Sequence, residues 1–148
     1  MKTIRWQMIM EEGEDYNHPP LLTAQSVSDY LRRSGHEMRD REVFIVLLLN
    51  VKNRIIADEI VSVGILDGAL IHPREVFCAA VHEKAAGVIV AHNHPSGDPT
   101  PSIADGDVTQ RLREAGKILG IPLIDHVIIA PGEVSNFYSF REKSEGIW

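Results

Sequence analysis

The first regular pattern of apolar positions predicts a helix over residues 23–33. Its apolar side chains recur three and four residues apart, which places them on one helical face. Thr23 or Ser26 can cap the amino end, and Gly35 can end the helix. Upstream, residues 3–10 predict a short strand, which is followed by an acidic stretch that ends in two prolines.

An uninterrupted apolar run, Val43–Leu49, predicts a strand that is buried on both faces. Residues 50–53 form a candidate turn, and residues 54–65 continue as a second strand. Because the turn is short, the two strands predict an antiparallel hairpin.

Helices and strands alternate in the second half of the chain. Pro73 can begin a helix that runs to about residue 86, and residues 87–91 and 123–130 predict two buried strands. Between these strands, Thr100 and Pro101 can begin another helix, which ends at Gly120. Its apolar stripe consists of Ala104, Val108, Leu112, Ala115 and Leu119. Alternation of this kind predicts an α/β fold of two or three layers, with a mixed sheet flanked by helices.

The length of 148 residues fits one domain with a buried core. We expect an extension over residues 1–22 and a single domain over residues 23–148. The apolar runs are too short to cross a bilayer, and the amino end becomes acidic before any secretory stretch develops. The sequence therefore predicts a cytoplasmic protein with no membrane segment, and it leaves the oligomeric state open.

Cysteine content and charge narrow the possible chemistry. Cys78 is the only cysteine, which excludes an intramolecular disulfide and a thiolate cage for zinc. A metal ion would therefore need imidazole and carboxylate ligands. The formal charge of −6 argues against nucleic acid as the main direct ligand, because phosphate binding needs a positive face.

The candidate chemistry lies in residues 91–105, AHNHPSGDPTPSIAD. Side chains alternate along a strand, so His92 and His94 should point the same way, at the end of a strand. Ser102 and Asp105 lie three residues apart near a helix start, which puts them on one helical face. Two imidazoles and a carboxylate would leave the fourth position of a zinc ion open to water, as in catalytic zinc sites. Ser102 could then donate a hydrogen bond to an oxyanion.

Less specific interpretations also fit parts of this segment. A histidine at a strand end is usually a hydrogen-bonded structural or surface residue, and Ser102 with Asp105 also fits a capping box. The string His92-Asn93-His94 does not indicate an HNH nuclease, because those enzymes spread the three residues over a much longer ββα segment.

The complete pattern is more specific: His-x-His-Pro, six residues, then Ser-x-x-Asp. It resembles the JAMM motif of the JAB/MPN metalloprotease superfamily, and the variant HNHPSGDPxPS is similar to the bacterial RadC branch. The likeness extends to VLLLN, VGIL, HPREVF and LIDHVII, and so covers about residues 25–141. It implies the JAB/MPN fold, which is similar to that of cytidine deaminase, and a zinc metallopeptidase activity.

The resemblance implies a role for each motif residue. The residues that match the zinc ligands are His92, His94 and Asp105. Ser102 matches the serine that stabilises the oxyanion. The general-base glutamate of the family lies just before the aliphatic strand, which is the place of Glu42, with Glu59 as the rival. Iron, manganese or cobalt could replace zinc at such a site.

Other residues within the resemblance have roles that the sequence leaves open. Asp125 or His126, on the last predicted strand, could orient a ligand imidazole, or the two could form a satisfied core pair. His72 and Arg74 could line the cleft, but capping of their own helix explains them equally well.

We therefore expect a zinc-dependent hydrolase that cleaves a peptide or isopeptide-like bond in a protein substrate, using water held by the His-x-His…Asp site. A DNA-repair accessory role follows from the traditional label of the RadC family. Longer RadC proteins add a helical amino-terminal region that this sequence is expected to lack, and its acidic balance also argues against that role. A non-enzymatic MPN scaffold commonly loses ligands, whereas every motif position is present here.

Overall fold

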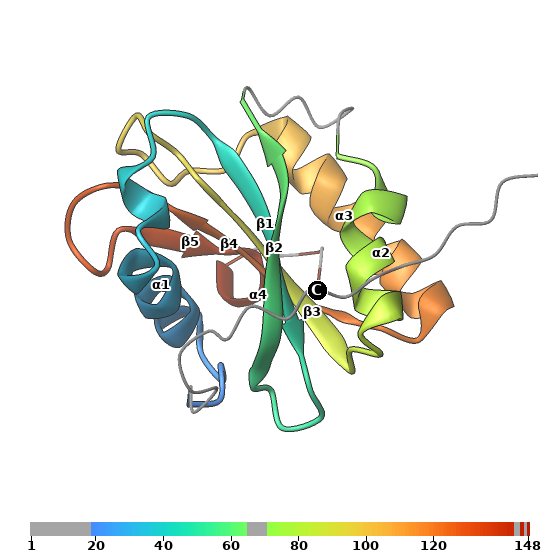
Figure 1. Cartoon of the computed structure of the whole chain (residues 1–148). Coiled ribbons are helices and arrows are strands. Elements are labelled where there is room, and N and C mark those ends of the chain that lie inside the picture. The colour runs from blue at the N-terminus through green and yellow to red at the C-terminus, as the bar shows by residue number, and fades with distance from the viewer. Residues whose placement is uncertain (1–18, 65–70, 144–145, 147) are drawn as a thin grey trace, which may run out of the picture.

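The computed structural model describes residues 19–64, 71–143, 146 and 148, which form a mixed five-stranded sheet with helices on both faces (Figure 1). The strands are β1 (Val43–Leu49), β2 (Ile55–Val63), β3 (Gly87–Asn93), β4 (Leu123–Ile129) and β5 (Phe137–Ser139). Their order in the sheet is β2-β1-β3-β4-β5. Strands β3 and β4 are parallel, and the other neighbours are antiparallel.

Two hydrophobic cores lie on the two faces of the sheet, and β1 contributes to both. The helices are α1 (Ala24–Arg33), η1 (His36–Met38), α2 (Pro73–His82), α3 (Ile103–Leu119) and α4 (Phe140–Lys143). Because side chains alternate along a strand, Phe44, Val46 and Leu48 pack with α2 and α3, whereas Ile45, Leu47 and Leu49 pack with α1. Figure 1 shows α1 on one side of the sheet and α2 and α3 on the other. The predicted α/β architecture is confirmed, in its three-layer form.

The first half of the chain folds as its pattern predicts. Thr23 caps α1 through a capping box with Ser26, and Gly35 adopts a left-handed conformation (φ 75°) directly after Ser34, the C-cap of the helix. The predicted hairpin is the antiparallel pair of β1 and β2. Continuous burial of β1 follows from its central place, since a strand covered on both faces needs apolar side chains on both.

Two predicted helix boundaries are wrong. Helix α2 ends at His82, not near residue 86, because Lys84 turns to a positive φ of 53° and the Ala85 N–H donates to the Ala80 carbonyl. Helix α3 begins after Ser102, not Thr100, since Ser102 supplies the cap. The last position of the predicted stripe of α3, Leu119, is 48% exposed.

The carboxyl-terminal elements β5 and α4 were not predicted, because segments of three and four residues are too short to show a period. The predicted strand over residues 3–10 and the end of the second strand at residue 65 lie outside the described residues. The division at residue 22 stays a prediction. Within the described part of the chain, no helix is long and apolar enough to cross a bilayer.

Candidate metal centre

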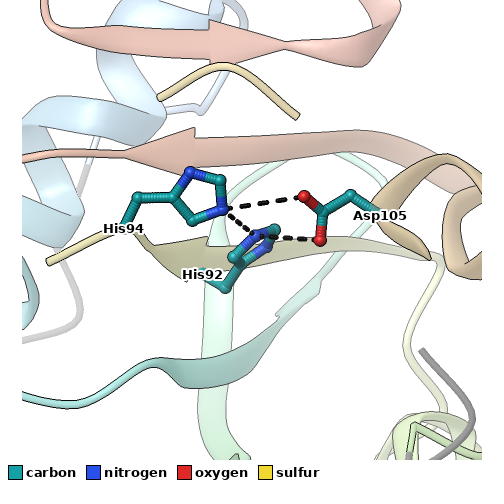
Figure 2. A group of neighbouring side chains, drawn as sticks. All are labelled: His92, His94 and Asp105. Carbon is teal, nitrogen blue, oxygen red and sulfur yellow. Dashed lines mark hydrogen bonds and ion pairs between the residues drawn. The ribbon is translucent and has the colours of Figure 1, made fainter. Parts of the chain in front are cut away.

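The side chains of His92 on β3, His94 just past that strand and Asp105 on α3 converge at the end of β3 (Figure 2). The Nε2 atoms of His92 and His94 are 3.0 Å apart. Asp105 Oδ1 lies 3.2 Å from His92 Nε2, and its Oδ2 lies 3.6 Å from His94 Nε2. Tetrahedral ligands at about 2.0–2.1 Å from a zinc ion are separated by about 3.3 Å. The three separations therefore fit ligands that share one ion.

The fold places these residues through a β3–α3 connection. His92 is the next-to-last residue of the buried strand β3, and the backbone N–H of His94, just past the strand, donates to the Ile129 carbonyl of β4 at 2.8 Å. The capping box of α3 fixes Asp105, because the Ser102 N–H donates to Asp105 Oδ2 at 2.7 Å and the Asp105 N–H donates to Ser102 Oγ at 3.1 Å. The capping-box interpretation and the ligand interpretation are thus compatible.

The hydrogen bond between His94 and Asp98 determines the tautomer of the His94 ring. Its Nδ1 lies 2.8 Å from the Asp98 carbonyl oxygen. A carbonyl only accepts hydrogen bonds, so Nδ1 carries the hydrogen and Nε2 of the neutral ring carries the electron pair. An ionised carboxylate also only accepts. Electron-pair donors that lie this close need a cation between them, either protons or a metal ion.

The electrostatics of the cluster agree with this need for positive charge. Burial favours a higher pKa for Asp105, but the contacts with His92 and His94 outweigh it and hold the pKa of this carboxyl far below its usual range. Burial favours a lower pKa for His94, but the Asp105 carboxylate, the Asp98 carbonyl and the charge of Glu42 raise that pKa above its ordinary value. Asp105 is therefore ionised, and His94 attracts either a proton or another cation.

Glu42 lies immediately before β1, beside the cluster. The antiparallel register pairs Phe44 with His92, and its continuation places Glu42 opposite His94. Together with Arg41 and Pro95, Glu42 lines a cavity of about 430 Å³. This position next to the candidate ligands is the one that the sequence predicts for a general base.

The rival carboxylate, Glu59, occupies a different place. It lies on β2 opposite Val46 and lines another cavity with Cys78 and His82 of α2. Of the two carboxylates, Glu42 is the one whose charge acts on a candidate ligand, His94. By position, Glu42 is therefore the carboxylate beside the cluster, and its role as general base stays a prediction.

Asn93, which the sequence analysis did not single out, holds the segment around Glu42. Its Oδ1 accepts from the Val43 N–H at 2.7 Å, and its Nδ2 donates to the Arg41 carbonyl at 3.0 Å. These bonds tie down the residues on both sides of Glu42. The only signal in the sequence was its place between His92 and His94, and alternation along β3 indicates only that this side chain points away from those two neighbours.

The remaining candidates have defined surroundings. The Ser102 hydroxyl accepts from the Asp105 N–H, so its own hydrogen remains for another acceptor, and its oxyanion role stays a prediction. His72 caps α2, since its Nδ1 accepts from the Arg74 N–H, as the capping interpretation requires. Asp125 accepts from Ser139 Oγ at 2.7 Å, and burial raises its pKa.

His126 lies directly against His92. Its Nε2 is 2.8 Å from His92 Nδ1, and its side chain is completely buried. Burial, and then the neighbouring His92, lower the pKa of His126 well below its ordinary value, so this ring is neutral. Of the two residues whose roles the sequence left open on β4, His126 is the one that contacts a candidate ligand.

Known proteins resemble this chain over most of its length. The RadC-like JAB domain family matches residues 21–146. A UPF0758 protein from Pelobacter propionicus is 55% identical over 115 residues, which cover 76% of this chain and 49% of that relative. A UPF0758 protein from Caldanaerobacter subterraneus subsp. tengcongensis is 49% identical over 127 residues, 84% of this chain and 52% of the relative. The chain thus spans about half the length of the curated relatives that it matches. On its sequence, the chain belongs to the RadC-like JAB domain family.

Proposed function

We propose that this domain is a metal-dependent hydrolase of peptide or isopeptide-like bonds, with zinc as the ion. The ligands in this proposal are His92, His94 and Asp105. The observation that supports it most directly is the convergence of two imidazole nitrogens and a carboxylate at separations of 3.0–3.6 Å. Three protein ligands leave a coordination position open, which is typical of catalytic sites, whereas structural sites have four.

The residues around the cluster supply the other groups that amide hydrolysis needs. A bound zinc ion would lower the pKa of a coordinated water molecule to about 7. In our proposal, the Glu42 carboxylate takes the proton of the attacking water and passes it to the leaving nitrogen as the C–N bond breaks. The Ser102 hydroxyl donates to the carbonyl oxygen as negative charge develops on it. The cavity beside Glu42 receives the substrate chain.

Two measurements on purified protein test this function. Elemental analysis should find about one zinc per chain, and a screen of peptides and isopeptide-linked peptides should identify a cleaved substrate. Glu42→Gln should keep the metal and lower turnover by about 10²- to 10⁴-fold, the usual contribution of a general base. Glu59→Gln is the matched control and should retain both metal and turnover.

Each outcome has a clear interpretation. Full turnover in Glu42→Gln would rule out Glu42 as the general base. An equal loss of turnover in Glu42→Gln and Glu59→Gln would show that turnover depends on the net charge of the chain and not on the position of the carboxylate. A wild-type chain that takes up no divalent metal would contradict the proposal as a whole.

A further inference from the structure

A hydrogen-bonded chain runs from His92 into the protein interior, on the side of the ring that faces away from the candidate ion. Nδ1 of His92 contacts His126 Nε2 at 2.8 Å, and His126 Nδ1 contacts Thr109 Oγ1 at 2.6 Å. The Thr109 hydroxyl in turn lies 2.6 Å from the Asp105 carbonyl oxygen. Both His126 and Thr109 are completely buried, so water cannot replace either contact.

Counting hydrogens along this chain gives one arrangement that leaves His92 able to bind a metal. The Asp105 carbonyl can only accept, so the single hydroxyl hydrogen of Thr109 goes to it. Thr109 Oγ1 then accepts from His126 Nδ1–H, which leaves His126 Nε2 as an acceptor. His92 must therefore donate from Nδ1 and present the electron pair of Nε2 to the cluster. Every donor in this arrangement has an acceptor.

The opposite arrangement is incompatible with metal binding. If His126 carried its hydrogen on Nε2, it would donate to His92 Nδ1 and force the hydrogen of a neutral His92 onto Nε2, the atom that faces the cluster. A 180° flip of either imidazole ring does not avoid this outcome. A ring that turned over would put a carbon atom where its nitrogen now makes the contact, so His92 would lose its contact with His126, or His126 its contact with Thr109.

We propose that Thr109 and His126 are positioning residues, which hold His92 in the tautomer whose Nε2 electron pair faces the candidate metal. Ligand histidines usually donate their second N–H to a carboxylate, a backbone carbonyl or water. Here a neutral imidazole takes that place, and a neutral imidazole can itself adopt either tautomer. The Thr109 hydroxyl is the group that selects between the two. This inference rests on the proposed metal site, which it extends into the core.

The test compares two substitutions at one buried position. Thr109→Val keeps the shape of the side chain but removes the hydroxyl, whereas Thr109→Ser keeps the hydroxyl and removes the methyl group. Competition with a chromogenic zinc chelator measures zinc affinity. We expect about 10- to 100-fold weaker binding in Thr109→Val, the usual effect of removing a partner of a ligand histidine, and near wild-type binding in Thr109→Ser. Ser28→Ala removes another completely buried hydroxyl, on α1, and should leave zinc affinity unchanged.

Nitrogen-15 spectra of the zinc-free wild-type protein give a readout that a packing effect would not produce. They should show the hydrogen of His126 on Nδ1 and that of His92 on Nδ1. A His126 hydrogen on Nε2, or equal losses of affinity in the valine and serine variants, would overturn the inference. Tight zinc binding by wild type and Thr109→Val alike would overturn it and leave the proposed function intact, whereas no zinc binding by wild type would contradict the proposed function itself.

Discussion

Zinc should stabilise the folded protein through His94, and the size of this effect follows from linkage. A ligand that binds only the folded state at a free concentration 100 times its Kd contributes about 2.7 kcal/mol to the free energy of unfolding. For a domain of this size, 1 kcal/mol raises Tm by about 2–4 °C, so zinc should raise Tm by about 5–10 °C. His94→Ala removes one of three candidate ligands at a half-buried position past the end of β3, where truncation leaves both cores intact.

A 100-fold loss of affinity in that variant would bring the same zinc concentration to its Kd. The stabilisation would then fall to about 0.4 kcal/mol, or about 1 °C. Differential scanning fluorimetry with and without zinc measures both shifts. His82→Ala is the matched control, because His82 is exposed on α2 and lines a cavity to which no candidate ligand contributes. An equal shift in wild type and His94→Ala would refute the reasoning, as would loss of the shift in His82→Ala.

Two further predictions concern the pH dependence of zinc affinity and the stability of the segment around Glu42. Because the pKa of His94 is raised, a proton competes with zinc for this ring. Zinc affinity should therefore stay level above the pKa of His94 and fall by about tenfold per pH unit below it. Chelator competition between about pH 5.5 and 8.5 measures this, and affinity that rises on acidification would contradict it. Asn93→Ala leaves the Val43 N–H without its acceptor and should lower the free energy of unfolding by about 1–3 kcal/mol. Hydrogen exchange at Val43 should become faster, and unchanged protection there would show that Asn93 does not hold the segment.

The hydrophobic pattern was enough to predict the hairpin and a mixed sheet flanked by helices, because β1 and the first five residues of β3 are apolar runs that suit a sheet covered on both faces. It left the choice between two and three layers open. Local patterns predicted the wrong start for α3, where two residues could cap the helix. Thr100 and Ser102 are both good caps, and Ser102 is used because Asp105, three residues later, completes a reciprocal capping box. Thr100 instead donates its N–H to Asp98 in the preceding loop.

The motif residues could be found from spacing, but their supporting contacts could not. The position of Glu42 opposite His94 depends on the register between β1 and β3, and the sequence does not specify that register. Asn93 and Thr109 look like ordinary strand and helix residues until the elements around them pack. For the same reason, Asp125 and His126 were equivalent candidates in the sequence, although alternation along β4 puts them on opposite faces.

A single β3–α3–β4 unit supplies the three candidate ligands and the residues that support His92, and this explains why these parts depend on one another. Strand β3 supplies His92, and the parallel pairing of β3 with β4 sets Val90 opposite His126, so that His126 reaches His92 from the neighbouring strand. Helix α3 connects these two strands and carries Asp105 and Thr109 four residues apart, on one face. The same helical turn therefore contacts His92 directly, through the Asp105 carboxylate, and supports it from behind, through Thr109 and His126. A shift of α3 along the sheet would disturb both contacts at once, so the geometry of the ligands and the tautomer of His92 are set by one packing interaction.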